Sequence, residues 1–240
     1  MTGYSLVIPC YNEALSLPAL IARCRELVEK VPGCEVVLVD NGSSDDSPAV
    51  FARELRAGEA VRSVRVEVNQ GYGFGITEGL RACRGEVIGW THADLQTDPM
   101  DAVAGFSLFA SAADPAGLFV KGRRYGRPPA DVLFTYGMSV FETILMRLPL
   151  RDINAQPTLF HRSLFESWAD PPKDFSLDLF AYVTAKRAGC AVRRFPVLFA
   201  PRVHGQSHWN VDWKAKLKFI RRTLDYSLAL RRRMSQGGRP

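Results

Sequence analysis

The sequence predicts an α/β fold in which a mostly parallel central sheet is flanked by helices. Two observations predict it. Short apolar runs alternate with amphipathic helical segments in the first half of the chain, and a polar or glycine-rich loop follows each run. This order is typical of parallel strands joined by right-handed helical crossovers. The chain has 240 residues, of which 47% are hydrophobic and 23% charged, which excludes disorder, collagen and coiled coil as its main state.

Each element of the first half has its own signal. The run YSLVI at 4–8 ends at Pro9, as a buried strand should. A helical stripe extends from Leu17 to Val28, and Pro32-Gly33 stops it. The elements then expected, in order, are a strand at 35–40, a helix through Phe51, strands at 63–68 and 86–90, and between these two a helix at 75–83.

The second half is less regular. It predicts a helix with a broad apolar face at 132–148, a short strand at 157–161, a helix at 175–188, a strand at 191–199, and a helix at 211–233. Repeats and low-complexity linkers are absent. We therefore expect one domain over residues 1–208 and a basic amphipathic helix and tail over residues 209–240.

The net charge of +6 is concentrated in that tail, which contains nine lysines and arginines but only two aspartates. An apolar stripe with Trp209 and Trp213 beside these cations is typical of a helix that lies on a membrane surface. The alternative is that the stripe packs on the domain and the charges face water. Nucleic acid is not expected as a partner, because no basic-aromatic platform accompanies the charge.

The five cysteines form no CxxC pair, which predicts buried free thiols in a reducing compartment. The N-terminus lacks the pattern of a signal peptide, and no run of about 18 apolar residues is present. We therefore expect a cytoplasmic protein, peripheral on the inner face of the cell membrane.

In an open parallel sheet, ligands bind beyond the carboxyl ends of the strands. Four polar loops are expected there, at 9–13, 40–46, 69–75 and 91–96. Their aromatic rings can stack on a base, their glycines can let the backbone approach phosphates, and Asp94 with Gln96 offers hard oxygen ligands for Mg²⁺ or Mn²⁺. Together the loops suit a nucleoside diphosphate with a metal. Taken singly, these features also have structural explanations. The glycines at 71–75 could form an ordinary loop, residues 45–47 could cap a helix, and Asp94 could be a solvated surface residue.

The strings LVIPCYNE, VVLVDNGSSDDS, NQGYGFGITEGLRACRGEVI and HADLQTDP resemble the nucleotide-binding half of family 2 glycosyltransferases, which have the GT-A fold. The strings KGRRY, DINAQPTLFHRSLF and FPVLFAPRVHGQSHW resemble the branch that contains dolichyl-phosphate mannose synthase and the bacterial polyprenyl-phosphate glycosyltransferases. The resemblance extends from about residue 4 to 209.

The resemblance implies a set of site residues. Those implied to bind the nucleotide-sugar donor are Pro9, Tyr11, Glu13, Leu38, Asp40, Gly71, Ala93, Asp94, Arg124, Arg202 and His208. Those implied to hold the metal are Asp94, Gln96 and His92. Those implied to act in catalysis are Asp94, Arg124 and Arg202, with Asp152 and Asp178 lining the sugar and acceptor side.

The chain departs from the family pattern at two positions. His92 stands where the family usually has an aspartate, which favours Mn²⁺ over Mg²⁺ if the imidazole binds metal; alternatively His92 contacts ribose or solvent. His208 replaces a lysine, so one permanent charge becomes pH-dependent.

The resemblance implies an inverting transfer of a sugar from a nucleoside-diphosphate donor to a polyprenyl phosphate at the cytoplasmic membrane face. A glycan or another hydroxyl acceptor is the alternative, for which Asp178 and then Asp152 are the candidate bases. The other class of function considered is a binding protein: a catalytically weak scaffold that binds nucleotide-sugar. The base, the sugar and the acceptor are left open.

Overall fold

The computed structural model describes residues 3–200 and 213–235, with the side chains of the last helix described from Ile220 onward. The strands are β1 (Tyr4–Cys10), β2 (Cys34–Asn41), β3 (Val61–Val66), β4 (Val87–Trp90), β5 (Leu118–Tyr125), β6 (Thr158–His161) and β7 (Ala191–Leu198). The helices are α1 (Leu17–Lys30), α2 (Ser47–Glu54), α3 (Tyr72–Ala82), α4 (Asp101–Ala110), α5 (Pro129–Met146), α6 (Arg162–Glu166), α7 (Leu177–Arg187) and α8 (Trp213–Ser235).

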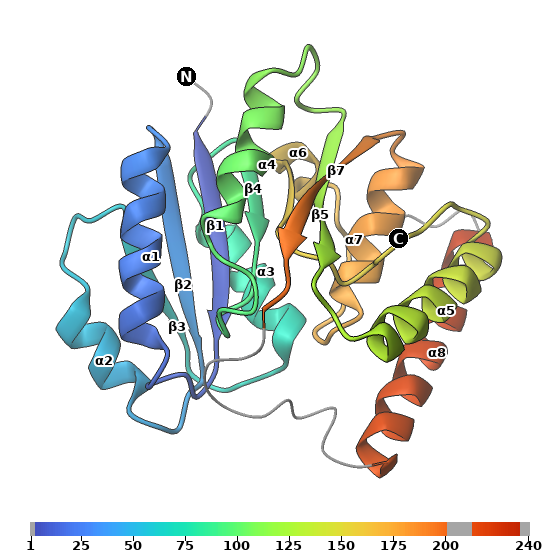
Figure 1. Ribbon diagram of the computed structural model, residues 1–240, viewed down its shortest axis with the longest axis horizontal. Helices are drawn as coiled ribbons and strands as arrows, with labels where there is room; N and C mark the ends of the chain where they lie inside the picture. The colour runs from blue at the N-terminus through green and yellow to red at the C-terminus, as the bar shows by residue number, and fades with distance from the viewer. Residues whose placement is uncertain (1–2, 201–212, 236–240) are drawn as a thin grey trace.

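Within the described residues, the strands form one sheet in the order β3-β2-β1-β4-β6-β5-β7 (Figure 1). Only β6 runs antiparallel to its neighbours, β4 and β5. All other pairs are parallel. The predicted mostly parallel α/β fold is therefore confirmed.

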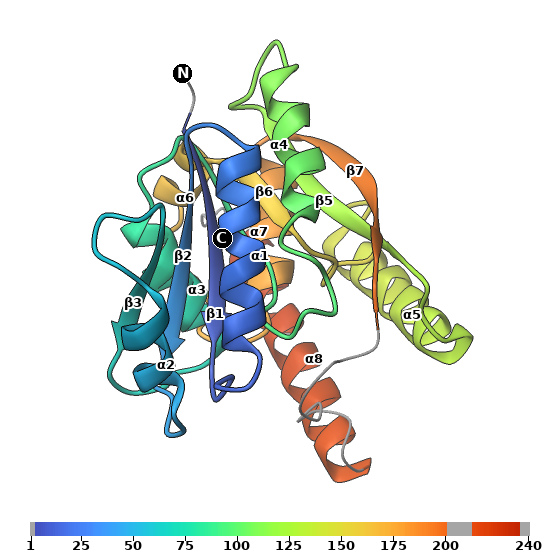
Figure 2. The same cartoon turned by 60° about the vertical axis from the view of Figure 1, so that its left-hand side comes forward.

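The sheet separates two apolar layers because successive side chains of a strand point to opposite faces. Leu6 and Ile8 pack with α1, α2 and α4 on one face. Val7 packs with α3 and α7 on the other. Figures 1 and 2 show these helices on either side of the strands. The resulting three-layer arrangement places the loops after β1, β2 and β4 at the same edge of the sheet.

The predicted elements form, with small shifts of their ends. The third strand covers Val61–Val66 rather than 63–68, and the third helix begins at Tyr72 rather than at 75. The sequence did not predict α4, β5 or α6. All five cysteines are free and four are buried, with Cys190 half-buried, which agrees with the expected thiols.

Helix α8 packs on the domain through its C-terminal half, where Ser227 and Leu230 are buried. Its Ser227 Oγ donates to Glu142 Oε1 on α5 at 2.6 Å, and Arg222 lies 3.1 Å from Asp174. The apolar stripe expected from sequence consists of Trp213, Leu217, Ile220, Leu224 and Leu228. The packed face differs from it, since Leu228 is exposed. The predicted domain boundary at 208/209, Trp209 and the side chain of Trp213 lie outside what the structure describes.

Within residues 3–200 and 213–235, no helix combines the length and apolar character needed to cross a membrane.

Candidate functional site

The loops after β1 and β2 form one hydrogen-bonded unit at the carboxyl edge of the sheet. The backbone N–H groups of Asn12 and Glu13 donate to Ser43 Oγ and Ser47 Oγ, both at 3.1 Å. The N–H of Ala14 donates to Asp45 Oδ2 at 3.1 Å. Hydroxyl and carboxylate acceptors from the second loop thus satisfy donors of the first, which fixes the two loops relative to each other.

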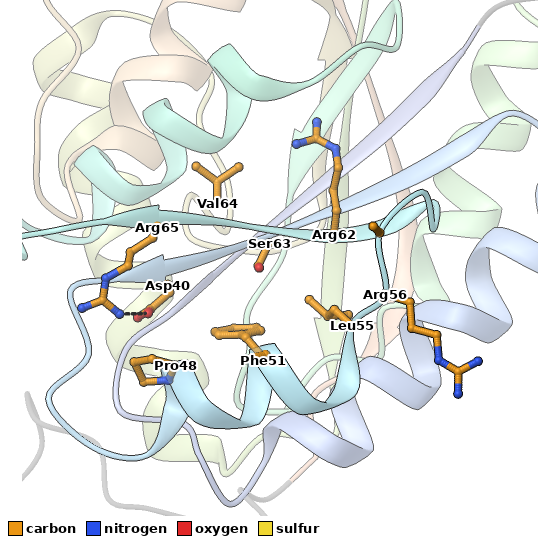
Figure 3. Close-up of a pocket in the computed structure, with 11 residues that line it drawn as sticks. Asp40, Pro48, Phe51, Leu55, Arg56, Arg62, Ser63, Val64 and Arg65 are labelled. Carbon is orange, nitrogen blue, oxygen red and sulfur yellow. Dashed lines mark hydrogen bonds and ion pairs between the residues drawn. The ribbon is translucent and has the colours of Figure 1, made fainter.

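Asp40 is the last residue but one of β2, lies inside this unit and is almost completely buried. Its Oδ1 accepts from the Ser43 N–H at 3.0 Å, and its Oδ2 accepts from Arg65 Nη1 at 2.9 Å. Figure 3 shows the Arg65 guanidinium reaching across from β3 to this carboxylate. The pocket drawn there, between α2 and β3, meets the site at Asp40 and Arg65. Sequence reasoning missed Arg65. Polar residues are interspersed with apolar ones along β3, so a polar residue there is expected to face solvent and gives no signal of a site.

Two of the other expected nucleoside contacts lie near Asp40 and one lies in the core. Pro9 pairs with Val39 at the end of β1, and Tyr11 is 42% exposed in the loop that follows. Leu38 is completely buried among the residues that pack against α1 and α2. The structure therefore places Leu38 beneath the site rather than on its surface.

The loop after β4 carries the expected metal ligands. Asp94 is buried, and its Oδ1 accepts from the Gln96 N–H at 3.1 Å. The Gln96 side chain donates through Nε2 to the Ala200 carbonyl at 3.2 Å, which ties this loop to the end of β7. Ala93 is buried in the apolar layer below. The His92 ring lies 6.1 Å from that of Tyr72 on α3.

These residues fit a divalent cation only in part. In the described part of the chain, no three histidine, cysteine or acidic side chains converge at metal-binding spacing. A hard cation that binds one carboxylate and takes its remaining ligands from a diphosphate needs no such cluster. Asp94, fixed at the sheet edge, is suited to that role.

Arg124 and Asp152 form an ion pair beside this loop. The backbone N–H and Nε of Arg124 donate to Asp152 at 3.2 and 3.0 Å, and its guanidinium also lies over the Phe199 ring. Burial alone would raise the pKa of Asp152, but the hydrogen bonds and charge of Arg124 outweigh it and hold that pKa below its usual value.

A second arginine, Arg127, joins this pair. Its Nη2 lies 3.9 Å from Asp152 Oδ1, and its Nη1 donates to Thr135 Oγ1 at 3.0 Å. Its Nε is buried without a hydrogen-bond partner in the described structure. Asp152 therefore gathers two guanidinium groups. Sequence reasoning singled out Arg124 but not Arg127, which lies between the KGRRY string and α5.

Asp178, in the first turn of α7, is buried beneath the same edge. Lys121, in the middle of β5, is completely buried and places Nζ 3.8 Å from Asp178 Oδ1. The same Nζ donates to Thr158 Oγ1 at 2.6 Å. Burial raises the pKa of Asp178 and lowers the pKa of Lys121 to about 7. Sequence reasoning gave no role to Lys121.

Gly71 has a packing role that the expected glycine loop did not reveal. It precedes α3 with a φ of +119°, and a Cβ there would lie 2.3 Å from the Lys173 carbonyl oxygen. The Phe74 N–H donates to that same oxygen at 3.0 Å. The close backbone approach at this glycine is therefore to the protein's own segment before α7. The contact that the resemblance implied with the donor stays a prediction.

Arg202 and His208 lie outside the described residues. The structure brings Asp40, Asp94, Arg124, Asp152 and Asp178 to the carboxyl edge of one sheet.

Residues 5–151 match the family model described as glycosyl transferase family 2. The chain therefore belongs to glycosyl transferase family 2, as its sequence strings predicted.

Its curated relatives include transferases that are named for undecaprenyl phosphate. It is 35% identical over 122 residues to an undecaprenyl-phosphate 4-deoxy-4-formamido-L-arabinose transferase of Pseudomonas syringae pv. syringae; the match covers 50% of this chain and 36% of that protein. It therefore spans about a third of the length of this relative. An uncharacterized glycosyltransferase of Mycobacterium tuberculosis is 29% identical over 212 residues, covering 85% of this chain and 88% of the relative.

Solved structures show the same fold. Glucosyl-3-phosphoglycerate synthase from Mycobacterium tuberculosis, in complex with Mn²⁺, UDP and glucosyl-3-phosphoglycerate, superposes with a TM-score of 0.72. The sequence identity is 18%, and the match covers 96% of this chain and 80% of the synthase chain. The complex of that enzyme with Mn²⁺ and UDP-glucose also gives a TM-score of 0.72. The fold is GT-A.

Proposed function

We propose that this protein is an inverting glycosyltransferase that moves a sugar from a nucleoside-diphosphate donor to a polyprenyl phosphate. One observation carries the proposal: two buried carboxylates, Asp40 and Asp94, are fixed at the carboxyl ends of β2 and β4, on either side of β1. A carboxylate at each position suits a nucleoside at one end of the donor and a diphosphate at the other.

The donor would lie along this edge. Pro9, Tyr11 and Glu13 would contact the nucleoside, and Asp40 would accept a hydrogen bond from the base. Asp94, with Gln96, would hold a divalent cation against the diphosphate, and that cation would offset the negative charge that grows on the leaving group. Solved relatives of the same fold bind Mn²⁺ with UDP, which supports this arrangement.

Arginines would also offset the negative charge on the leaving diphosphate. Arg124 would contact the diphosphate, with Asp152 as the group that orients its guanidinium. Because Asp152 is engaged by Arg124 and its pKa is lowered, it is a poor proton acceptor, and we assign it a positioning role rather than that of a base. Arg202 and His208 would add positive charge from outside the described residues.

The acceptor is proposed to be a lipid phosphate. A phosphate is already an anion near neutral pH, so it needs no base to attack the sugar. The undecaprenyl-phosphate relatives favour this acceptor. An exposed apolar stripe on α5 also favours it, formed by Leu133, Tyr136, Val140 and Ile144. These residues follow one another at helical spacing, so they lie on one face that could meet the membrane holding such a lipid.

The first experiment is a calorimetric titration of the protein with UDP, GDP and their sugar conjugates in Mn²⁺, in Mg²⁺ and in EDTA. We expect one nucleotide to bind in the presence of metal and binding to weaken at least about tenfold in EDTA. Asp94→Ala should abolish the metal dependence.

The matched control is Asp114→Ala, an exposed carboxylate before β5 and thus at the opposite edge of the sheet. It should leave binding unchanged. Absence of binding by every nucleotide with every metal would refute the proposed donor site. If binding is observed, transfer to undecaprenyl phosphate is compared with transfer to undecaprenol, which has a hydroxyl in place of the phosphate.

A further inference from the structure

The buried pair of Lys121 and Asp178 is not accounted for by donor binding. Lys121 is fully enclosed between strands and helix, with the rings of Phe119 and Tyr182 each 5.8 Å from Nζ. A lysine in such surroundings loses the hydration of its charge, which is costly unless a partner offsets it. Its partners are Thr158 Oγ1 at 2.6 Å and the Asp178 carboxylate at 3.8 Å.

Asp178 has an unused acceptor. Its Oδ1 is buried and makes no hydrogen bond in the described structure, because 3.8 Å to Lys121 Nζ is too long for one. Native proteins leave few buried polar atoms unsatisfied, and those that remain often await a ligand or a catalytic event. The charged groups that influence Asp178 are Lys121 and Arg124 from β5 and His92 from the loop after β4.

The position of Asp178 connects this pair to the site. Arg124 belongs to the proposed donor site, and His92 lies in the same loop as Asp94. Burial and the charges of both Asp178 and Asp94 raise the pKa of Tyr72 at the start of α3. The hydroxyl of Tyr72 accepts a hydrogen bond from Gln156 Nε2. Asp178 is therefore within electrostatic range of the loop after β4 and of the end of β5.

We infer that Lys121 is a positioning residue that keeps Asp178 as a carboxylate, and that Asp178 Oδ1 accepts a hydrogen bond from a hydroxyl of the transferred sugar. This inference rests on the proposed function and on the place at the sugar side that the sequence resemblance implies for Asp178. Thr158 fixes Lys121 from β6, so the ammonium stays under the carboxylate. Without the ammonium, a carboxylate buried this deeply takes up a proton and becomes a donor instead of an acceptor.

The charged groups that influence Lys121 itself are Asp178, Arg194, Asp152 and Arg124. Arg194 donates to the Gly122 carbonyl at 2.9 Å and lies over the Tyr182 ring, while Asp152 is engaged by Arg124. Asp178 is thus the acidic group left to pair with the Lys121 ammonium among these neighbours.

The test uses Lys121→Met, which keeps the length of the side chain and removes its charge. The carboxyl carbon of Asp178 is observed by ¹³C NMR in protein labelled at aspartate and assigned by its loss in Asp178→Asn. We expect the signal of an ionised carboxylate at pH 6, below the pKa of about 7 of Lys121, in the unaltered protein and of a protonated carboxyl in Lys121→Met. An ionised Asp178 in Lys121→Met would overturn the inference.

Kinetics provide the second readout. Lys121→Met and Asp178→Asn should each lower kcat by about 100-fold while the dissociation constant of the nucleotide stays within about threefold. The double variant should be no slower than either single one, because both changes remove the same carboxylate. Equal kcat for Lys121→Met and the unaltered protein, or a loss confined to nucleotide binding, would overturn the inference.

Two further variants guard against a folding defect. Thr158→Val keeps the shape of the side chain and removes the hydroxyl that accepts from Lys121 and donates to the Ala155 carbonyl at 3.4 Å, and it should lower kcat by about tenfold. Lys30→Met removes an exposed lysine at the end of α1 and should change neither readout. If the unaltered protein transfers no sugar at all, the proposed function fails, whereas the NMR comparison still decides whether Lys121 keeps Asp178 ionised.

Discussion

Asp40 shows how a single side chain can be prepared for a ligand before the ligand arrives. Ser43 and Arg65 each hold one of its oxygens, so its carboxylate cannot rotate. Arg65 itself is 44% exposed and also lies 3.5 Å from Glu67. The guanidinium therefore fixes the carboxylate from the solvent side.

We predict that Arg65→Ala weakens nucleotide binding by about tenfold, because the Asp40 carboxylate loses the charge-assisted bond that orients it. Calorimetric titration with the nucleotide that binds best measures the effect. Arg56→Ala is the control: Arg56 lines the same pocket, and Figure 3 shows it directed away from Asp40. Equal losses in the two variants would contradict the orienting role of Arg65.

The sequence predicted some residues of the site and missed others for a physical reason. Asp40 and Asp94 could be found because they follow apolar strands, where the parallel fold places ligands. Lys121 and Arg127 could not, since their roles come from neighbours more than ten residues away in the chain or on other elements. Gly71 was found as a glycine, but its contact with residue 173 depends on tertiary packing alone.

The joint between α5 and α8 contains a carboxyl group that water scarcely reaches. Glu142 is 1% exposed, and among the described residues only its Oε1 has a hydrogen bond, from Ser227. Burial raises the pKa of Glu142 from 4.5 to about 7, and the Ser227 hydroxyl opposes this shift. The folded protein therefore holds a proton here that the unfolded chain releases above about pH 4.5.

We predict that this joint loses stability as the pH rises. The raised pKa of Glu142 stabilises the fold at low pH. About 3 kcal/mol of this stability is lost as the pH rises from about 4.5 to about 7. Glu142→Gln, which keeps an acceptor for Ser227 and cannot ionise, should flatten the dependence and be the more stable protein at pH 8. Urea unfolding at pH 5 and pH 8 measures both, and parallel pH profiles for the two proteins would refute the prediction.

Elements were predictable where their pattern was local. The strands β1 and β2 are continuous apolar runs, and α1 shows a clear stripe ended by Pro32-Gly33. By contrast, α4 (DAVAGFSLFA) is apolar nearly all round, so it shows no polar face. The strand β5 has the buried Lys121 in its middle. A charged residue there interrupts the apolar run by which a buried strand is predicted.

At the scale of the whole molecule, the exposed face of α5 should decide where the protein resides. Leu133 and Ile144 are each 72% exposed, and α8 beside α5 carries exposed arginines such as Arg221 and Arg232. We predict that Leu133→Asp combined with Ile144→Asp reduces flotation with vesicles of anionic lipid by at least about tenfold, because each aspartate brings charge to the apolar contact.

Val68→Asp, at an exposed apolar residue after β3, is the matched control and should bind vesicles like the unaltered protein. Binding should also fall as salt rises, since the arginines act through screened attraction. Unchanged flotation of the α5 variant would remove the membrane from the proposed function and favour an acceptor in solution.

The place of β6 in the sheet has a consequence for synthesis of the chain. β4 and β5 are made before residue 126, but β6, which separates them, comes from residues 158–161. Gly89 makes room for it, since a Cβ there would lie 2.0 Å from the Thr158 carbonyl. During synthesis, β4 and β5 therefore each have an unpaired edge until β6 leaves the ribosome. Unpaired strand edges can pair with other chains and cause aggregation. Nascent chains that stall before residue 158 are the forms that chaperones must protect.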